Sequence, residues 1–139
     1  MAPDSGTTPL VVAVVDDDAG MRHSLESLLE SAGYTVRLFP SATSLLQELD
    51  LATVDCLVTD VVMPLMDGLE LTRIIHQDRP DLPVILITGG DLSIDKVPRV
   101  RDRRALFRKP LNSDRLLSAI RAAIGDPMPP PAGPAGTRD

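Results

Sequence analysis

The strongest constraint on the fold of this chain is a short apolar run that ends in a carboxylate. Residues 56–60 have the sequence Cys-Leu-Val-Thr-Asp, and Pro64 follows after three apolar residues. A run without a polar face is typical of a strand buried on both sides, and the proline marks a loop beyond it. On its own, Asp60 is most simply a loop aspartate that accepts hydrogen bonds from nearby backbone N–H groups.

A second apolar run ends in the same way. Residues 10–15 are all apolar, and Asp16, Asp17 and Asp18 follow them directly. Two buried strands that both end in acids are poorly explained as two unrelated loop starts. The pair predicts one shared site where both strands end.

Helix-like segments lie between the strand-like runs. Apolar residues at helical spacing predict helices over 21–32, 45–49, 69–75 and 116–124. Gly33 supplies a left-handed stop for the first helix, and Ser41 and Asn112 are candidate N-caps for the second and the last. Between residues 91 and 104, Pro98 and sparse apolar positions predict a short or distorted fourth helix.

Further strands complete an alternating pattern. They are predicted over 34–39, 84–88 and 105–107. Apolar and polar residues largely alternate in the first of these, which places it at a sheet edge. Five strand-helix units imply a parallel sheet with right-handed crossovers and helices on both faces.

Composition limits the classes of protein that remain. The chain has 139 residues, 43% of them hydrophobic but only three aromatic, which predicts one domain with an aliphatic core. A formal charge of −6 argues against direct nucleic-acid binding, since phosphate contacts need a basic surface. Cys56 is the only cysteine, so no disulfide framework or zinc spacing exists. No apolar stretch is long enough to span a membrane, and no signal peptide is recognisable, so we expect a cytoplasmic protein.

The two ends of the chain differ from its middle. Residues 1–9 are small and polar, and residues 126–139 are rich in Pro, Gly and Ala. Neither segment has much apolar surface to bury, so we expect a disordered leader and a disordered Pro-rich tail. The ordered domain is expected over residues 10–125.

The predicted topology gathers the polar strand ends into one place. In an open parallel sheet, ligands bind outside the carboxyl ends of the strands, where the strand order reverses. With the order 2-1-3-4-5, this point lies between the first and third strands. Residues expected there are Asp16, Asp17 and Asp60, with Thr88 and Lys109 at neighbouring strand ends.

These residue types suit the transfer of a phosphoryl group. Converging carboxylates repel one another, and a hard cation such as Mg²⁺ relieves the repulsion through oxygen ligands. Lys109 offers a positive charge and Thr88 a hydroxyl for phosphoryl oxygens, while Gly89 leaves space beside them. The arrangement favours in-line transfer with Asp60 as the nucleophile.

Four fragments together resemble the receiver domain of two-component response regulators, especially the nitrogen-fixation-regulator-like subfamily. The fragments are Val-Asp16-Asp17-Asp18, Thr-Asp60-Val-Val-Met-Pro, Ile-Thr88-Gly and Arg-Lys109-Pro. They lie in order at predicted strand ends within residues 10–124. The resemblance implies a flavodoxin-like fold and a signalling phosphoprotein, which catalyses only its own phosphorylation and dephosphorylation.

The resemblance also implies a role for each site residue. Asp60 accepts a phosphoryl group from a phosphohistidine on a sensor histidine kinase or a phosphotransfer protein. Asp17 and Asp60 bind Mg²⁺ directly, Asp16 binds it through water, and the backbone carbonyl of Val62 completes the protein ligands. Thr88 and Lys109 hold the phosphoryl oxygens. The plainer alternatives are a strand-end hydroxyl for Thr88 and a solvated cation for Lys109.

Three positions depart from the family pattern. The switch position three residues before the lysine, usually Tyr or Phe, is Leu106 here. The segment 101–105 lacks the usual small-residue turn with glycine, which adds to the doubt that Pro98 raises about the fourth helix. Val62 has no side-chain amide or carboxylate to orient a water molecule, which predicts slow self-dephosphorylation.

Basic residues gather near the end of the chain, between Lys96 and Arg108. Such a cluster is most simply a solvated surface. By the resemblance, the Arg99–Arg108 region is also a candidate surface for a downstream protein partner or a weak homodimer, with salt-sensitive binding.

Other functions remain open at this point. A degenerate receiver would bind proteins without taking up a phosphoryl group, and Leu106 favours this alternative. A small phosphatase with an Asp-x-Asp motif would use Asp16 and Asp18, although such enzymes normally need a longer chain. The sequence leaves open whether the chain stands alone or comes from a longer regulator.

Overall fold

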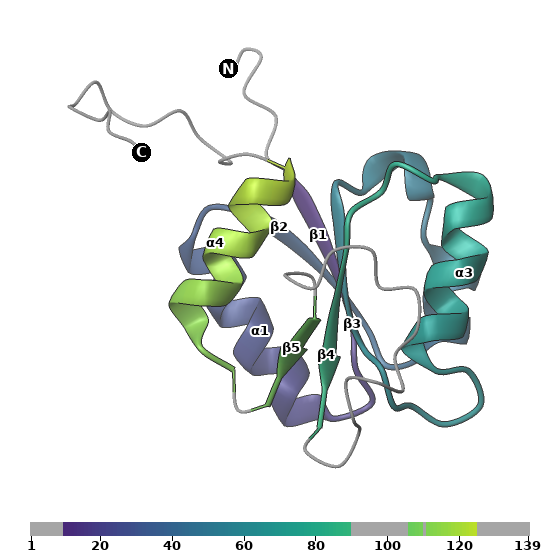
Figure 1. Cartoon of the computed structure of the whole chain (residues 1–139), viewed down its shortest axis with the longest axis horizontal. Coiled ribbons are helices and arrows are strands. Elements are labelled where there is room, and N and C mark those ends of the chain that lie inside the picture. Colours follow the sequence, from purple (N-terminus) through teal and green to yellow (C-terminus); the bar gives the residue numbers. More distant parts are fainter. Residues whose placement is uncertain (1–9, 90–105, 110, 125–139) are drawn as a thin grey trace.

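The computed structural model of the chain describes residues 10–89, 106–109 and 111–124 (Figure 1). These residues form one five-stranded sheet with the order β2-β1-β3-β4-β5, in which every neighbouring pair is parallel. The strands are β1 (Val11–Val15), β2 (Thr35–Phe39), β3 (Cys56–Asp60), β4 (Val84–Thr88) and β5 (Leu106–Arg108). The flavodoxin-like sheet and its predicted order are confirmed, with β2 at the predicted edge.

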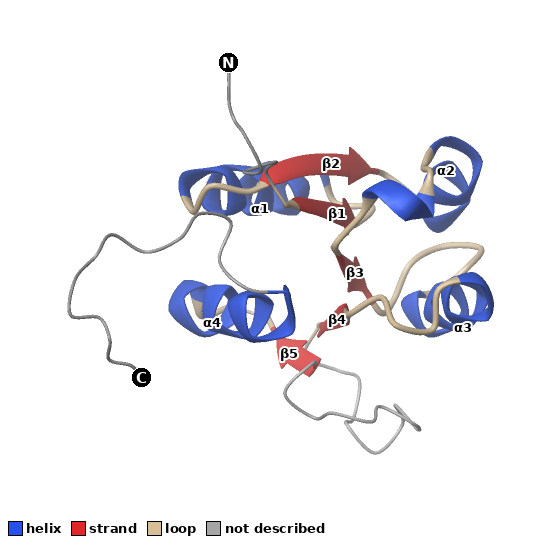
Figure 2. Ribbon diagram, turned by 90° about the horizontal axis from the view of Figure 1, so that it is seen from above, coloured by secondary structure: helices blue, strands red, loops and turns tan. Residues whose placement is uncertain are grey.

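Helices cover both faces of the sheet, as predicted (Figure 2). One face carries α1 (Ala19–Ser31) and α4 (Ser113–Ile124), and the other carries α2 (Ala42–Glu48) and α3 (Gly68–Asp78). A short 3-10 helix, η2 (Leu51–Thr53), precedes β3 without a clear signal in the sequence. The helix predicted within 91–104 lies outside the described residues, so α4 is the helix that the sequence places last.

The predicted helix ends are confirmed. Gly33 follows α1 with a positive φ of 99°, a conformation that glycine adopts without steric cost. The Ser41 side chain accepts a hydrogen bond from Ser44 N at 3.1 Å, and Asn112 Oδ1 accepts one from Arg115 N at 3.0 Å. These caps fix where α2 and α4 begin.

Each face of the sheet has its own apolar core, because successive strand residues point to opposite faces. Val12 packs in the cluster under α1 and α4, whereas Ala13 packs in the cluster under α2 and α3. All five residues of β3 are buried, as predicted for a strand that is covered on both sides. Burial also raises the pKa of the Cys56 thiol to about 12, so this residue acts as a small apolar side chain.

Parallel pairing brings the carboxyl ends of the strands to one edge of the sheet, named here the carboxyl edge. Asp60 is paired with Ile87, and Thr88 is paired with Arg108. The predicted site residues therefore become neighbours although they are far apart in the sequence.

None of the described helices is both long and apolar enough to cross a membrane. The predicted leader and tail lie outside the described residues.

Candidate functional site

Asp60 occupies the centre of the carboxyl edge, at the end of the middle strand of the sheet. Only 6% of its surface is exposed. Its Oδ1 accepts a hydrogen bond from Val62 N at 3.2 Å, and its Oδ2 accepts one from Lys109 Nζ at 3.2 Å. The carboxylate is therefore oriented by the backbone on one side and by a cation on the other.

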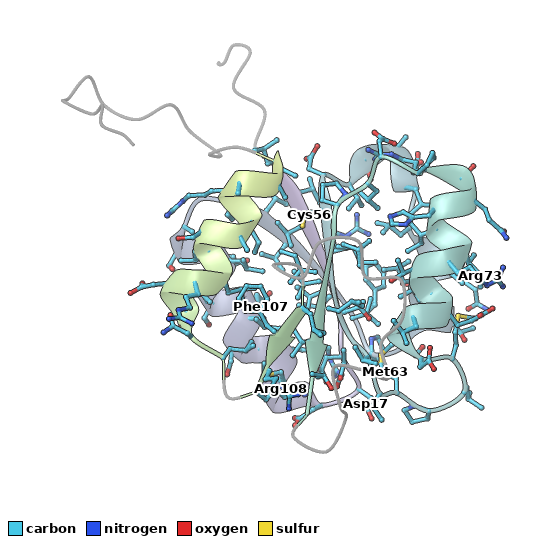
Figure 3. The ribbon with its side chains drawn as sticks, viewed as in Figure 1. Asp17, Cys56, Met63, Arg73, Phe107 and Arg108 are labelled. Carbon is cyan, nitrogen blue, oxygen red and sulfur yellow. The ribbon has the colours of Figure 1, made fainter. Side chains whose placement is uncertain are left out.

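The three consecutive acids after β1 have different environments. Asp16 is 1% exposed, and its Oδ1 accepts a hydrogen bond from Asp18 N at 2.9 Å. Asp17 is exposed at the carboxyl edge, at the same end of the sheet as Met63 and Arg108 (Figure 3). Asp18 is the N-cap of α1. Only the first two of these acids therefore turn toward the site.

Asp16, Asp17 and Asp60 form a group that fits a divalent cation. One carboxylate oxygen from each lies within 4.8 Å of the others. In addition, Asp16 Oδ2 is buried and accepts no hydrogen bond within the described part of the chain. Buried oxygens of this kind normally have a partner, and a set of oxygen donors alone suits Mg²⁺. The predicted acids are thus brought together in an arrangement that Mg²⁺ would satisfy.

Lys109 joins the far side of the sheet to these acids. It follows β5 directly, and its backbone N–H donates to Thr88 O at 2.9 Å. Its Nζ lies 3.2 Å from Asp60 Oδ2 and 3.6 Å from Asp16 Oδ2. The first contact is a hydrogen bond and the second an ion pair only. Lys109 is therefore paired with the acids of the site and is not a free surface cation.

Burial and charge act against each other at this edge. Burial raises the pKa of the Asp16 carboxyl, and the nearby charge of Asp60 adds to the increase, while the Asp18 backbone and Lys109 reduce it. For Lys109, burial disfavours the ammonium, but the attraction of Asp16 and Asp60 outweighs it and raises the pKa. The lysine is therefore charged at neutral pH and offsets part of the carboxylate repulsion.

Thr88 lies at the carboxyl edge, on the strand that pairs with β3. It is fully buried at the end of β4, and its hydroxyl donates to Gly89 O at 3.2 Å. A Cβ added at Gly89 would meet no atom within 4 Å, so open space lies beside Gly89, the residue after Thr88. The sequence predicts that the Thr88 hydroxyl binds a phosphoryl oxygen, and in this structure that hydroxyl is engaged with Gly89 O.

A family comparison places this geometry among known proteins. The sequence model of the response regulator receiver domain family matches residues 12–121, which is most of the chain. The chain belongs to the response regulator receiver domain family. The predicted resemblance is therefore confirmed, and the receiver's matched region includes the three acids, Thr88 and Lys109.

Two of the named relatives of this receiver are described as transcriptional regulatory proteins. It is 37% identical over 124 residues to the transcriptional regulatory protein FixJ of Bradyrhizobium diazoefficiens, covering 88% of this chain and 60% of that protein. It is 41% identical over 114 residues to the C4-dicarboxylate transport transcriptional regulatory protein DctD of Rhizobium meliloti, covering 81% and 25%. The chain thus spans 60% or less of the length of these relatives.

Solved structures show the same fold. A response regulator receiver domain protein from Clostridium thermocellum superposes with a TM-score of 0.75 at 28% identity, covering 83% of this chain and 94% of that one. Full-length FixJ from B. japonicum superposes with a TM-score of 0.68 at 36% identity, covering 88% and 61%. The receiver therefore has the arrangement of a domain that also occurs within longer regulators.

Leu106 and Phe107 of this receiver lie on opposite faces of the sheet. Leu106 is partly buried against Val61 and Leu86, whereas Phe107 packs in the cluster under α1 and α4. Because neighbouring strand residues point to opposite faces, Phe107 does not take the place of an aromatic residue at position 106. Within the basic region from Arg99 onward, only residues 106–109 are described, and Arg108 is exposed there.

Two residues that support the site carry only a weak signal in the sequence. Arg22 reaches back from α1 and donates from Nη1 to Asp16 O at 2.7 Å, which holds the acidic turn. Gly68 begins α3 against the strand end, where an added Cβ would lie 2.3 Å from Asp60 O. An arginine six residues after an acid is too common to single out. A glycine near a helix start suggests a turn but not a close approach to Asp60.

Proposed function

We propose that this receiver takes a phosphoryl group onto Asp60 from the phosphohistidine of a sensor histidine kinase or phosphotransfer protein, and then signals by protein contact. The observation that carries the proposal is the position of Lys109 Nζ, 3.2 Å from the Asp60 carboxylate and 3.6 Å from Asp16. A cation held between two nearly buried acids can bind the oxygens of an incoming phosphoryl group.

The chain's own residues supply most of the proposed chemistry. A carboxylate oxygen of Asp60 forms a bond to phosphorus while the bond from phosphorus to the histidine nitrogen breaks, and the imidazole keeps that electron pair. Lys109 neutralises charge on the phosphoryl oxygens. The Thr88 hydroxyl would leave Gly89 O and donate to a phosphoryl oxygen in the adjoining open space.

Mg²⁺ is the proposed cofactor. Asp17 and Asp60 would hold it directly, Asp16 would hold it through water, and the Val62 carbonyl would complete the set. When bound, the cation neutralises the carboxylates and phosphoryl oxygens so that the acceptor and the phosphate group can approach each other.

The alternatives differ from this proposal at particular residues. An Asp-x-Asp phosphatase would need the Asp18 side chain in the site. Instead, Asp18 Oδ1 accepts hydrogen bonds from Gly20 N and Met21 N at the start of α1. A degenerate receiver would keep the fold without accepting the phosphoryl group. The orientation of the Asp60 carboxylate by Val62 N and Lys109 Nζ favours the working receiver.

Intact-protein mass spectrometry tests the proposal. The protein is incubated with acetyl phosphate and Mg²⁺, beside the variant Asp60→Asn and a sample with EDTA. We expect one phosphoryl adduct in the wild type and none in either comparison. Asp18→Asn is the matched control, since asparagine caps helices as well as aspartate does, and it should keep the adduct. A folded wild-type protein without an adduct would favour the degenerate receiver instead.

A further inference from the structure

Arg22 holds the acidic turn, residues 16–18, through two of its own donors. Its backbone N–H donates to Asp18 O at 3.0 Å, and its side-chain Nη1 donates to Asp16 O at 2.7 Å. One residue of α1 therefore contacts both ends of the turn that comes before the helix. The second contact is a charge-assisted hydrogen bond, and such bonds are stronger than those between neutral groups.

The side-chain contact of Arg22 fixes the peptide that joins Asp16 to Asp17. Asp16 N donates to Phe39 O at 3.2 Å, which holds the peptide on the other side of Asp16. The carbonyl that Arg22 binds lies in one plane with Asp17 N, so its direction sets how the Asp17 side chain leaves the backbone. Because Asp17 is exposed, packing does little to orient it.

The Arg22 guanidinium binds a carbonyl although three acids lie in the same turn. The planar donors of arginine match a carboxylate well, and pairs of this kind are common. Within the described residues, however, Arg22 forms no ion pair. Arg22 thus holds the backbone of the turn and leaves the carboxylates of Asp16 and Asp17 available to a cation.

We propose that Arg22 is a positioning residue for the Mg²⁺ site, which fixes the peptide between Asp16 and Asp17 so that their carboxylates meet that of Asp60. This inference rests on the proposed function, in which Mg²⁺ is the cofactor. One carboxylate oxygen from each acid lies within 4.8 Å of the others, and this spacing depends on the shape of the turn. Residues behind the ligands of a metal site commonly set its affinity by orienting those ligands.

The charge of Arg22 and its hydrogen bond predict opposite effects on Mg²⁺ binding. If only charge mattered, loss of a cation near the acids would tighten binding, because less repulsion would oppose the metal ion. If the hydrogen bond matters, the freed peptide leaves Asp17 less well placed, and binding weakens. A purely structural role would lower the stability of the protein and leave the affinity of the folded protein unchanged. The sign of the change therefore separates these roles.

An NMR titration with Mg²⁺, followed through backbone amide shifts, measures the Kd and shows that each variant is folded. Arg22→Met removes the side-chain donors, and Arg22→Lys keeps the charge on a side chain that ends one atom earlier. Arg37→Met is the matched control, since it removes an exposed arginine from β2. We expect the Kd to rise about tenfold in Arg22→Met, by a smaller factor in Arg22→Lys, and to stay within about twofold in the control.

An unchanged or lower Kd in Arg22→Met would overturn the proposal, and the same criterion applies to Arg22→Lys if the first variant does not fold. An equal rise in Arg37→Met would overturn it as well, because the loss of any arginine would then have the same effect.

Phosphorylation by acetyl phosphate gives a second measurement. Asp60 keeps its own contacts from Val62 N and Lys109 Nζ. Arg22→Met should therefore reach the wild-type maximal rate at saturating Mg²⁺, but it should need about tenfold more Mg²⁺ for half of that rate. A lower maximal rate at saturating Mg²⁺ would contradict an action of Arg22 through the metal site.

The proposed function fails separately from this inference. If the wild type binds no Mg²⁺, the cofactor proposal is wrong, and the role of Arg22, which depends on it, is overturned as well. If the wild type and Arg22→Met bind Mg²⁺ equally tightly, only the role of Arg22 is wrong. If the wild type binds Mg²⁺ but takes no phosphoryl group, the phosphoacceptor proposal fails, and the Kd values alone decide the role of Arg22.

Discussion

The two halves of the carboxyl edge are built differently. The acidic half, after β1 and β3, holds each buried acid by a backbone contact, from Asp18 N to Asp16 and from Val62 N to Asp60. In the half after β4 and β5, Lys109 already contacts Asp60, but the Thr88 hydroxyl bonds to Gly89 O instead. We infer that the acidic half can bind the cation and the phosphoryl group without rearranging. In the other half, named here the Thr88 half, we infer that the Thr88 hydroxyl moves from Gly89 O to a phosphoryl oxygen when the phosphoryl group arrives.

The largest expected effect is a loss of stability when the close contact between Gly68 and the Asp60 backbone is disturbed. Gly68→Ala would place a Cβ 2.3 Å from Asp60 O, a backbone atom that cannot move without displacing β3. We expect a loss of about 3 kcal/mol in the free energy of unfolding, measured with urea. Gly20→Ala is the control, because its Cβ would meet only the Asp18 side chain, at 3.3 Å. Equal stability of the two variants would show that α3 does not constrain Asp60.

Lys109 provides the next test, since it is the contact between the two halves. Lys109→Met removes a positive charge from beside Asp16 and Asp60, so Mg²⁺ should bind about tenfold more tightly. Without Mg²⁺, the variant should be less stable by about 2 kcal/mol, because the acids lose their cation. Both effects can be measured from Tm as a function of Mg²⁺ concentration.

Arg108→Met is the matched control for this change, since it removes an exposed cation from the neighbouring position. We expect it to leave the affinity for Mg²⁺ within about twofold of the wild type, since exposed charges interact weakly. Weaker Mg²⁺ binding in Lys109→Met would mean that the lysine organises the acids instead of competing with the cation.

A smaller effect should follow from the raised pKa of Asp16. The folded protein binds a proton at Asp16 more tightly than the unfolded chain, so the ionised carboxylate destabilises the metal-free fold above the folded pKa. Asp16→Asn should therefore be more stable than the wild type at pH 7, with a higher Tm. This advantage should shrink as the pH falls through the folded pKa of Asp16 toward its usual value of 3.8.

Thermal unfolding in EDTA at several pH values measures this difference. Asp18→Asn serves as the comparison, since Asp18 caps α1 and should show no such pH-dependent gain. A variant Asp16→Asn that is less stable than the wild type at pH 7 would show that the attraction of Lys109 outweighs the burial of Asp16.

Much of the fold was predictable because its signals are local. The apolar runs that end in Asp16 and Asp60 identify buried strands, and Gly33, Ser41 and Asn112 mark helix ends through their own side chains or backbone. The segment 91–104 has no comparable pattern, and the prediction made for it lies outside the described residues.

The predictable part of the site consists of residues at strand ends, because the topology alone brings Asp60 and Lys109 together. Contacts that depend on the third dimension were not predictable. The sequence gives no sign that Arg22 reaches the Asp16 carbonyl, that Gly68 lies against Asp60 O, or that the Thr88 hydroxyl bonds to Gly89 O.

A crystal structure of the protein with Mg²⁺ and beryllofluoride, an analogue of the phosphoryl group, would decide whether the two halves differ as inferred. We predict the analogue on Asp60, with the Asp18 N to Asp16 Oδ1 contact kept and the Thr88 hydroxyl moved from Gly89 O to the analogue. An analogue bound to Asp60 while Thr88 still donates to Gly89 O would contradict the inferred change in the Thr88 half. An analogue bound to a different acid would contradict the assignment of Asp60 itself.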